Sequence, residues 1–476
     1  MLLARRGFKV TLFEKKTTVG GRNAELRLGE FSFDTGPTFL MMKEILDKVF
    51  EEAGAASDDY LDFKRLEPMY RLQFDDFHLD PTTDPAGMKA EIARHFPGKE
   101  DTLDAFMSRE GKRFEHLFPC LQKPYHQLRT LASPTLLRAV PHLALGRTIF
   151  DLLYSYFGDE RLALAFTFQS KYLGMSPWDC PALFAILPYI EHKFGVYHTQ
   201  GGLCRISRAM ADVGCDNGLE LVTGEAVRQV LVESGRARGV LLENGDEVTA
   251  DAVVINADFG YAMTELMPPD ALRKYTREKV ARRRFSCSTF MLYLGLDVCY
   301  DAPHHTIVFA RDYRENVEEV FNRKVLSDDI SFYVRNASVT DPGLAPPGKS
   351  AVYILVPVPN LAGEIDWENT KTAFRDLVLD AVAANTPMTD IRDHIEVEEM
   401  ICPSDWEADY DVYRGATFNL THDLRQMIYL RPHNAFEDVA DCYLVGGGTH
   451  PGSGLPTIYE SGRISAGLIV DRFGWQ

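Results

Sequence analysis

Residues 443–470 read YLVGGGTHPGSGLPTIYESGRISAGLIV. Tyr443–Val445 is apolar, like the end of a buried strand, Gly446–Gly448 lets the backbone approach a ligand closely, and a helix is predicted from about Pro456. The unpaired N–H groups of a helix start favour an electron-rich ligand edge by about 0.3–2 kcal/mol. The stretch therefore predicts a strand, a ligand-contacting loop and a helix N-terminus, although a glycine-rich connection without a ligand has the same local pattern.

The opposite end of the chain supplies a second part of such a site. It opens MLLARRGFKVTLFEKKTTVGGR, in which Phe8–Phe13 alternates like a buried strand and Glu14 ends it. An acidic residue in this place holds ribose hydroxyls in dinucleotide-binding folds. Gly20, Gly21 and Arg22 then form a turn where backbone can approach a cofactor, with an arginine able to bind a phosphate. In this order the residues resemble the second strand of an FAD-binding oxidoreductase.

Four blocks carry a closer resemblance: FDTGPT at Phe33–Thr38, TQGGLCRISRAMA at Thr199–Ala211, LRPHN at Leu430–Asn434 and GGGTHPGSGLP at Gly446–Pro456. They are similar to the signature blocks of bacterial-type phytoene desaturases, the FAD-dependent carotenoid desaturase and oxidase family. The similarity extends over nearly the whole chain, and THPGSGLP is its most specific part. The continuation TIYESGRI departs from the commonest family form, which leaves the exact substrate open.

The resemblance implies an α/β fold with two parts. An FAD-binding Rossmann-like (dinucleotide-binding) domain is expected to comprise residues 1–62, 195–284 and 436–476. A discontinuous substrate domain of mixed sheet plus helices is expected to comprise a helical membrane and substrate-access region at 63–194 and a sheet at 285–435. Within the first domain, the strand patterns between Leu219 and Ile255 are interpreted as a meander, because Ser234-Gly235 and Asn244-Gly245 are turn signals.

The resemblance also implies FAD as the cofactor. Val227 falls where such folds use backbone groups to hold adenine, and Asn256, Ala257 and Asp258 follow a buried strand where small residues lie beside a flavin nucleotide. The expected cofactor contacts are Glu14, Lys15, Gly20, Gly21, Arg22, Gly36, Pro37, Thr38, Val227, Asn256, Ala257, Asp258, Gly447, Gly448, Gly454, Leu455 and Pro456.

The start of the chain departs from the pattern that this fold requires. A first strand, a G-x-G-x-x-G loop and a helix should precede the second strand, with the acidic residue about 20 residues beyond the glycines. Glu14 lies too near Met1 for that, and Met1–Gly7 is interpreted as the last turns of the first helix with a glycine cap. We therefore expect an N-terminal truncation, with in-frame upstream sequence encoding the missing strand and loop.

Composition restricts the partners. The net charge of −18 argues against nucleic acid and against broad attraction to anionic lipid. The eight cysteines show no C-x-x-C spacing, which favours reduced core residues in a cytoplasmic protein. No metal site is expected, because His304 and His305 are adjacent strand residues pointing to opposite faces and no further ligand has suitable spacing.

One region departs from this acidic character. Between His116 and Phe150 there are basic residues but no acidic one, and no stretch of about 18 apolar residues could span a bilayer. The region is interpreted as a helical cap over a substrate pocket, as a membrane-facing surface, or as both. In the second case the residues dipping into lipid are Leu136, Leu137, Val140, Leu143, Leu145, Ile149 and Phe150. We accordingly expect a cytoplasmic protein, peripheral on the cytoplasmic membrane; the oligomeric state stays open.

The implied reaction is desaturation of a long apolar polyene, in which FAD takes a hydride from an allylic C–H while a proton leaves the neighbouring carbon. Asp159 is the candidate catalytic base, since family members carry acidic residues in a similar Asp-Glu-x-Leu context; a solvated carboxylate at a helix start is the alternative. A desaturase or oxidase of shorter diapo-carotenoids, a carotene isomerase or an amine-oxidase relative are alternative enzymes. A non-catalytic lipid binder without flavin is the alternative of another class.

Overall fold

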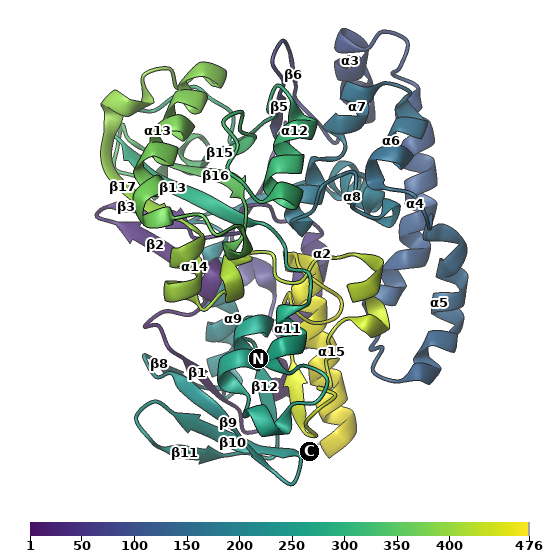
Figure 1. Cartoon of the computed structure of the whole chain (residues 1–476), viewed down its shortest axis with the longest axis vertical. Helices are drawn as coiled ribbons and strands as arrows, with labels where there is room; N and C mark the ends of the chain where they lie inside the picture. The colour runs from purple at the N-terminus through teal and green to yellow at the C-terminus, as the bar shows by residue number, and fades with distance from the viewer. Residues whose placement is uncertain (475–476) are drawn as a thin grey trace.

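The computed structural model describes residues 1–474, and only the backbone of Tyr172. The lower half of the molecule holds two parallel strand pairs (Figure 1). β1 (Thr11–Glu14) pairs with β8 (Glu220–Thr223), and β12 (Val253–Ile255) pairs with β18 (Cys442–Leu444). Within residues 1–474 the two pairs are separate sheets.

Four helices of the lower half pack against one another through their apolar faces. They are α1 (Leu2–Arg5), α2 (Lys43–Glu52), α9 (Cys204–Asp216) and α15 (Leu455–Phe473). Their shared core contains Leu46, Phe50, Ile206 and Leu455. In α2 the buried residues recur three and four positions apart, which is the spacing of one face of a helix. The helix predicted from about Pro456 is confirmed, since α15 begins one residue earlier, at Leu455.

The predicted meander is smaller than its sequence pattern indicates. β9 (Val227–Glu233), β10 (Arg236–Leu242) and β11 (Glu247–Thr249) form an antiparallel sheet in the order β11-β10-β9. The strand patterns on either side belong to β8 and β12, which pair in parallel with distant partners instead. Apolar alternation marks a strand without selecting the strand beside it, so the prediction was wrong about these two pairings.

The upper half contains a seven-stranded mixed sheet in the order β17-β13-β16-β15-β14-β5-β6. Its strands are β5 (Arg71–Gln73), β6 (His78–Leu79), β13 (Ser288–Leu296), β14 (His305–Val308), β15 (Phe332–Asn336), β16 (Ser350–Val358) and β17 (Ile395–Ile401). Every position of β13 is buried, because both faces of the sheet are covered. Phe290 and Leu292 pack against α13 (Trp367–Asn385), while Tyr293 packs against Phe33 on the other face.

Two short strand pairs connect this sheet to the lower half. β2 (Glu25–Leu28) pairs with β3 (Phe31–Asp34), and β4 (Phe63–Arg65) pairs with β7 (Tyr197–Thr199), both antiparallel. The remaining short helices are α10 (Phe259–Tyr261), α11 (Arg277–Ala281), α12 (Tyr313–Val317) and α14 (Pro403–Tyr410). β5 and β6 form an antiparallel hairpin, and β5 joins the large sheet through a parallel pairing with β14.

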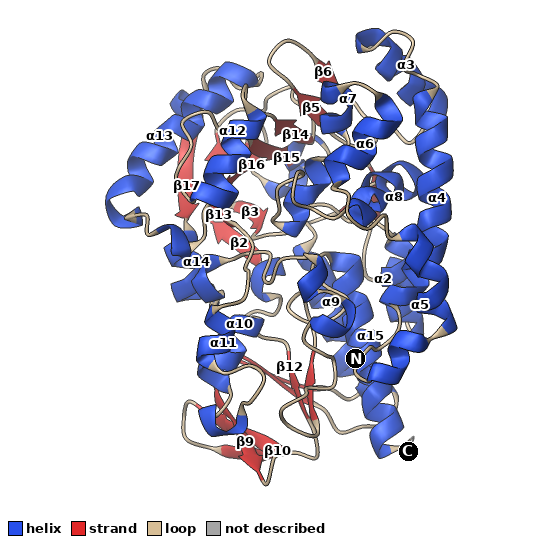
Figure 2. Cartoon of the chain, turned by 45° about the vertical axis from the view of Figure 1, so that its right-hand side comes forward, coloured by secondary structure: helices blue, strands red, loops and turns tan. Residues whose placement is uncertain are grey.

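A helical region forms one side of the molecule (Figure 2). It consists of α3 (Pro85–His95), α4 (Thr102–Leu121), α5 (Pro134–Ala139), α6 (Ile149–Phe157), α7 (Glu160–Ala165) and α8 (Ile186–Phe194). Its core is aromatic, with Phe106, Phe157 and Phe166 in mutual ring contact. None of the helices in residues 1–474 combines the length and the apolar character needed to span a bilayer.

The acid-free region between His116 and Phe150 divides into buried and exposed residues. Ile149 is fully buried and Leu136 is 8% exposed, so the prediction that both enter lipid was wrong: they belong to the protein core. Leu143 and Phe150 are partly buried against the same cores. The exposed apolar residues are Leu128 at 68%, Leu137 at 59%, Val140 at 46% and Leu145 at 61%.

Candidate functional site

A short segment, Thr417–Leu420, brings together three blocks that lie far apart in sequence; we call it the junction segment. Arg22 Nη1 donates to Thr417 O at 2.6 Å, and Ser453 Oγ donates to Phe418 O at 2.7 Å. Asn419 Nδ2 donates to Asp258 Oδ2, also at 2.6 Å. The first glycine turn, the end of β12 and the loop before α15 are thereby joined around one piece of backbone. Sequence reasoning missed this segment, because TFNL has no pattern of its own.

Asp258 is a structural centre of the junction. Its carboxylate accepts from the backbone N–H of Gly260 at 3.0 Å and of Tyr261 at 3.3 Å, which caps α10. Burial raises the pKa of Asp258, and the nearby charge of Arg22 opposes that rise. The predicted residue is therefore at the site, and its own hydrogen bonds are made to protein groups.

The glycines of the signature blocks lie against protein atoms. A Cβ on Gly448 would lie 2.4 Å from Phe259 Cβ and 2.8 Å from Asn419 Oδ1. A Cβ on Gly36 would lie 2.5 Å from Arg22 O. The sequence predicts glycine at these positions because backbone approaches a ligand; the structure shows that close packing between the blocks already requires it.

Arg431, from the LRPHN block, holds the loop that follows β18. Its guanidinium is fully buried and donates to Thr449 O at 3.0 Å, to Thr421 O at 3.3 Å and to Gly447 O. Burial lowers the pKa of Arg431 to about 9, with a smaller contribution from Arg283. An arginine bonded only to carbonyl oxygens fixes the position of a loop, because its planar fork of donors reaches several acceptors at once.

His422 supports the same loop from the other side. Ser453 N–H donates to His422 Nε2 at 3.0 Å, which requires an unprotonated ring nitrogen. Burial holds the pKa of His422 well below its usual value, and Arg431 contributes in the same direction. The neutral histidine is thus a stable acceptor at this point. Neither Arg431 nor His422 had been predicted as a site residue, although the LRPHN block pointed to the first.

A second group of predicted residues lies at the end of β1. Glu14 Oε1 accepts from Lys16 N at 2.9 Å, and Glu225 N donates to Glu14 O at 3.1 Å, which places the start of β9 at Val227 close by. Lys15 forms an ion pair with Asp411. Glu14 therefore lies at the carboxyl end of a parallel strand, where dinucleotide-binding sheets bind ribose.

The ends of β12 and β18 meet beside the junction segment. Asn256 Oδ1 approaches Gly446, and Ala257 and Gly448 line a hollow of about 10 Å³ together with Thr449. α15 begins at Leu455–Pro456 behind Gly454, which has a positive φ of 107° and offers no side-chain cap. Two buried polar atoms near Arg22, Thr417 Oγ1 and Asn23 Oδ1, have no hydrogen-bond partner among the residues that the structure describes.

A buried polar network connects the predicted FDTGPT block to the large sheet. Asp34 accepts from Cys204 N at 2.7 Å and pairs with Arg335 Nη1 at 2.8 Å. Arg335 Nη2 also lies 3.3 Å from His198 Nδ1, and His198 Nε2 lies 3.1 Å from Asp341 Oδ2.

The same block meets the sheet a second time through Thr38. Thr38 Oγ1 is 2.9 Å from Tyr333 OH, which is 2.7 Å from His305 Nδ1. The rings of His304 and His305 are in contact, with centroids 4.3 Å apart, so the prediction that they point to opposite faces was wrong. In residues 1–474 no group of three or more His, Cys, Asp or Glu is arranged to hold a metal ion.

Asp159 lies away from both groups. It is the N-cap of α7, with Oδ1 accepting from Leu162 N at 3.0 Å. In Figures 1 and 2, which differ by a turn about the vertical axis, α7 lies near the top and α15 in the lower half. The geometry favours the helix-start carboxylate over the catalytic base, and the base assignment stays a prediction.

The family model for flavin containing amine oxidoreductases matches residues 1–470. The chain belongs to this family. It is similar to a 4,4'-diapophytoene desaturase (4,4'-diapolycopene-forming) of Methylomonas sp, with 53% identity over 99% of this chain and 92% of that protein. It is also similar to the all-trans-zeta-carotene desaturase of Myxococcus xanthus, with 38% identity over 99% of this chain and 90% of that protein.

The chain is also similar in fold to solved structures. An oxidoreductase from Methanosarcina mazei has a TM-score of 0.61 at 16% identity, over 99% of this chain and 97% of that one. A putrescine oxidase has a TM-score of 0.60 at 15% identity, over 98% and 95%. These structures confirm the predicted fold class, and the relatives confirm the predicted place among the FAD-dependent carotenoid desaturases. The alignments cover 99% of this chain, and the expected truncation stays a prediction.

The residues of this flavoprotein family member fit FAD in two places. The end of β1 offers Glu14, whose Oε2 accepts no hydrogen bond within residues 1–474. The junction offers the orphan hydroxyl of Thr417, the orphan amide oxygen of Asn23 and the uncapped start of α15. Unpaired polar groups beside a helix N-terminus suit a polar ring system with electron-rich oxygens.

Proposed function

We propose that the chain desaturates a polyene of the 4,4'-diapophytoene class, with FAD held between the end of β1 and the junction segment. The observation that carries the substrate class is the 53% identity to a 4,4'-diapophytoene desaturase over nearly the full chain, against 38% to a zeta-carotene desaturase. Of the enzymes that the sequence leaves open, the diapo-carotenoid desaturase is thus the best supported.

Bound FAD supplies the oxidant that accepts a hydride from an allylic C–H. The chain's own residues would bind FAD and orient it. We assign Glu14, Lys15 and Val227 to the adenosine part. Arg22, Gly36, Asn256 and the glycines of the loop before α15 lie where they would contact the flavin part. We propose with it the division into an FAD-binding domain of 1–62, 195–284 and 436–476, with helices at 63–194 and the sheet at 285–435.

The polyene has few groups to bind by hydrogen bonds, so aromatic surface should receive it. Phe39 directly follows Thr38 and lies in ring contact with Tyr70 at 6.0 Å and with Tyr333 at 5.7 Å between centroids. Phe168 contacts Tyr70 at 4.9 Å. This group lies between the proposed flavin contact Thr38 and the helical region, which supports it as the place where the polyene meets the cofactor.

The flavin assignment is tested by one steric change with a matched control. Gly448→Ala should lose bound flavin, because its methyl group would lie 2.4 Å from Phe259 Cβ in the loop at the junction. Gly462→Ala in α15 should keep it, because nothing lies within 4 Å of that position. The readout is flavin absorbance per protein, with circular dichroism as a check on folding. Full flavin content in folded Gly448→Ala protein would contradict the assignment.

The substrate class is tested directly. The FAD-loaded protein is given 4,4'-diapophytoene and phytoene in separate vesicle preparations, and products are followed by chromatography with detection of the lengthened polyene. Faster conversion of the diapo-carotenoid is expected, and faster conversion of phytoene would refute this substrate assignment.

We also propose that the protein takes its substrate from a membrane surface. Moving a polyene from lipid into water costs about 0.8 kcal/mol per CH₂ group, so the substrate has no useful concentration in water. Leu137 and Leu145 are two of the four exposed apolar residues of the acid-free region, and we assign to them the contact with lipid that the sequence assigned to Ile149. With a net charge of −18, short-range contact must supply the attraction.

The docking proposal is tested with Leu137→Asp/Leu145→Asp, measuring co-sedimentation with vesicles and turnover of detergent-dispersed substrate. Vesicle binding should fall while detergent turnover stays. Val339→Asp, at a position 47% exposed outside the acid-free region, is the control and should bind as before. Unchanged vesicle binding by the double variant rejects the docking surface.

A further inference from the structure

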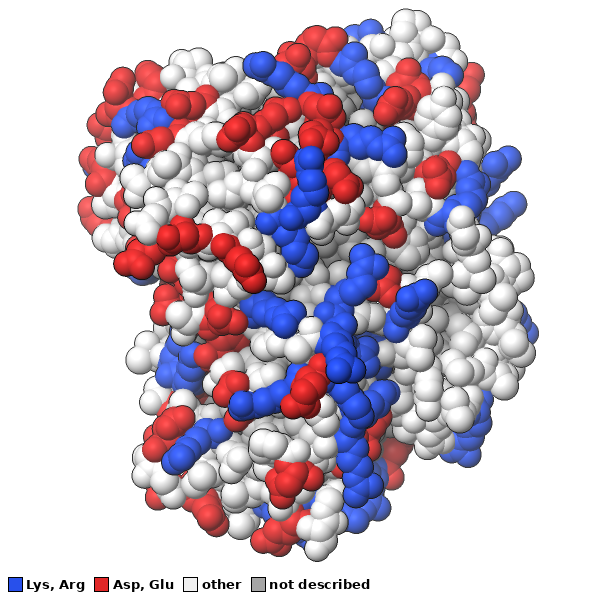
Figure 3. All heavy atoms as spheres, viewed as in Figure 1, with Lys and Arg blue, Asp and Glu red and all other residues white. Residues whose placement is uncertain are grey.

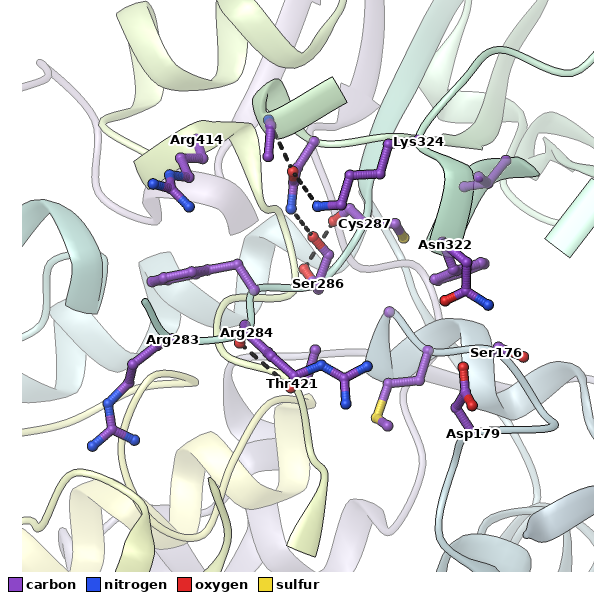
Figure 4. Close-up of a pocket in the computed structure, with 17 residues that line it drawn as sticks. Ser176, Asp179, Arg283, Arg284, Ser286, Cys287, Asn322, Lys324, Arg414 and Thr421 are labelled. Atoms are coloured by element: carbon purple, nitrogen blue, oxygen red, sulfur yellow. Dashed lines mark hydrogen bonds between the residues drawn. The ribbon is translucent and has the colours of Figure 1, made fainter. Parts of the chain in front are cut away.

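A cavity of about 330 Å³ opens on the face shown in Figure 3, and neither the cofactor nor the polyene assignment uses it. Its walls come from the segment before β13, from the end of the helical turn that follows α12 and from the chain beyond the junction segment. Figure 4 shows Ser286 and Cys287 on one side and Asn322, Ser176 and Asp179 on the other, with Arg284 between them. We call it the basic cavity.

The basic cavity concentrates positive charge in an acidic protein. Arg283, Arg284, Lys324 and Arg414 line it, against the single acidic residue Asp179. Within residues 1–474 none of the four cations forms an ion pair with a carboxylate. A chain with a net charge of −18 thus places four cations around one hollow without neutralising them.

The contacts that these cations do make are to neutral groups. Lys324 Nζ lies 3.5 Å from Asn360 Oδ1, and Arg414 Nη1 donates to Ala281 O at 3.2 Å. Arg283 Nη1 lies 3.5 Å from Leu430 O. The side chain of Arg284 makes no hydrogen bond in the part of the chain that the structure describes. Most of the guanidinium N–H groups around the cavity are therefore free to bind a ligand.

The cations also act on one another. Burial lowers the pKa of Lys324, and the positive charges of Arg414 and Arg284 lower it further. Like charges gathered in a partly enclosed space repel, so an anion between them would be stabilised by all of them. The spacing around a single hollow is what distinguishes this group from scattered surface lysines and arginines.

The hydrogen-bond donors around the basic cavity indicate which kind of anion it would bind. Guanidinium groups present planar pairs of N–H donors that match the oxygens of a phosphate, and lysine adds a point charge. Asn322, Asn360 and Thr421 supply neutral polar groups in the same lining, and Met175, Phe285 and Phe321 supply apolar surface. A phosphate group attached to an apolar body fits such a lining better than a bare carboxylate or chloride would.

The position of the basic cavity on the surface also suits a phosphate group attached to an apolar body. In Figure 3, Lys and Arg gather along the middle of this face, next to a broad uncharged area on the right, where Figure 1 places α5. Exposed Leu430 and Leu424, at 50% and 45%, lie on the chain that Arg283 contacts. A lipid phosphate bound in the basic cavity would thus lie beside apolar surface.

We propose that the basic cavity is a binding site for a phosphate group, carried either by a membrane lipid or by a small soluble anion. The basic cavity is separate from the proposed flavin contacts. Thr421 is the link between them, because it lines the cavity and its carbonyl oxygen accepts a hydrogen bond from Arg431. The geometry that carries the proposal is four unpaired cations around one hollow.

The test removes two of the charges. In Arg284→Gln/Lys324→Gln the cavity loses two charged donors, of which Lys324 has one long contact, 3.5 Å to Asn360 Oδ1. Arg273→Gln/Arg282→Gln removes the same charge from exposed arginines outside the cavity and is the control. Inorganic phosphate is titrated by calorimetry at constant ionic strength. Flotation is measured with vesicles of phosphatidylcholine, alone and mixed with phosphatidylglycerol.

The unsubstituted protein should bind at least one probe, and the cavity variant should bind it at least roughly tenfold more weakly, as loss of charge-assisted hydrogen bonds implies. The control should bind like the unsubstituted protein. A deficit with inorganic phosphate identifies a small anion, and a deficit confined to phosphatidylglycerol vesicles identifies a lipid; both support the site. Binding of neither probe, or an equal loss in variant and control, overturns it.

Discussion

Glu191 is a buried carboxylic acid that should make the free energy of unfolding depend on pH. Its side chain is fully buried in the helical region, where Tyr70 OH donates to Oε2 at 2.8 Å and Gln169 Nε2 donates to the same oxygen at 2.6 Å. Oε1 has no hydrogen-bond partner, and Glu191 forms no ion pair within residues 1–474. Burial raises the pKa of Glu191 to about 7 from 4.5, although both hydrogen bonds oppose the rise.

This pKa difference has a definite sign for stability. The unfolded chain loses the proton near 4.5 and the folded chain near 7, so between these values the folded state binds more protons. The free energy of unfolding therefore falls as pH rises through this window. At about 1.4 kcal/mol per pH unit, the loss attributable to this group reaches about 3 kcal/mol above pH 7.

Glu191→Gln keeps the shape of the side chain and removes the titration. The variant should gain stability relative to the unsubstituted protein as pH rises from 4.5 to 7. The difference between the two proteins should change by about 3 kcal/mol across this range and stay constant above it. Denaturant unfolding followed by tryptophan fluorescence at several pH values measures the difference. Glu115→Gln, on the exposed side of α4, is the control. A difference that does not change with pH, or that falls as pH rises, would refute the reasoning.

Two further predictions concern the groups that hold the site together. Asp34→Asn should lower the free energy of unfolding by about 3–5 kcal/mol, because it leaves the buried charge of Arg335 without its partner. Denaturant unfolding measures this loss, and a loss below about 1 kcal/mol would mean that the pair contributes little. Arg431→Lys keeps a positive charge, but one ammonium group cannot reach the carbonyls of Gly447, Thr449 and Thr421 together. Bound flavin should therefore decrease in a protein that still folds. Unchanged flavin content after dialysis would show that the loop holds its position without the guanidinium.

Much of the candidate site could be predicted from local sequence. The end of β18, the glycine loop and the start of α15 follow from an apolar run, three glycines and a proline, and the structure has all three elements in that order. Glu14 ends β1 as predicted, but the strand begins at Thr11 and not at Phe8, and Leu12 is 41% exposed, so the predicted burial of this strand was wrong. These features are local because a few neighbouring residues decide the backbone conformation.

Other parts of the site needed the fold. Asn419 and His422 have no distinguishing pattern around them, and the LRPHN block marks Arg431 without showing what it binds. Their roles come from contacts with the distant residues Asp258, Ser453 and Gly447. Sequence placed Ile149 on a lipid-facing surface because it is apolar and lies in an acid-free stretch. Burial depends on what packs against a helix, and here Ile149 meets the aromatic core.

The sequence by itself determined which segments are strands and helices, where backbone must be glycine, and that the chain is an FAD-dependent carotenoid desaturase by its motifs. Only the tertiary structure decided that β8 pairs with β1 and β12 with β18, that Thr417–Leu420 joins three blocks, and that four cations surround one cavity. The division has a physical cause: local conformation depends on neighbouring residues, whereas strand pairing, burial and the gathering of like charges depend on residues separated by hundreds of positions.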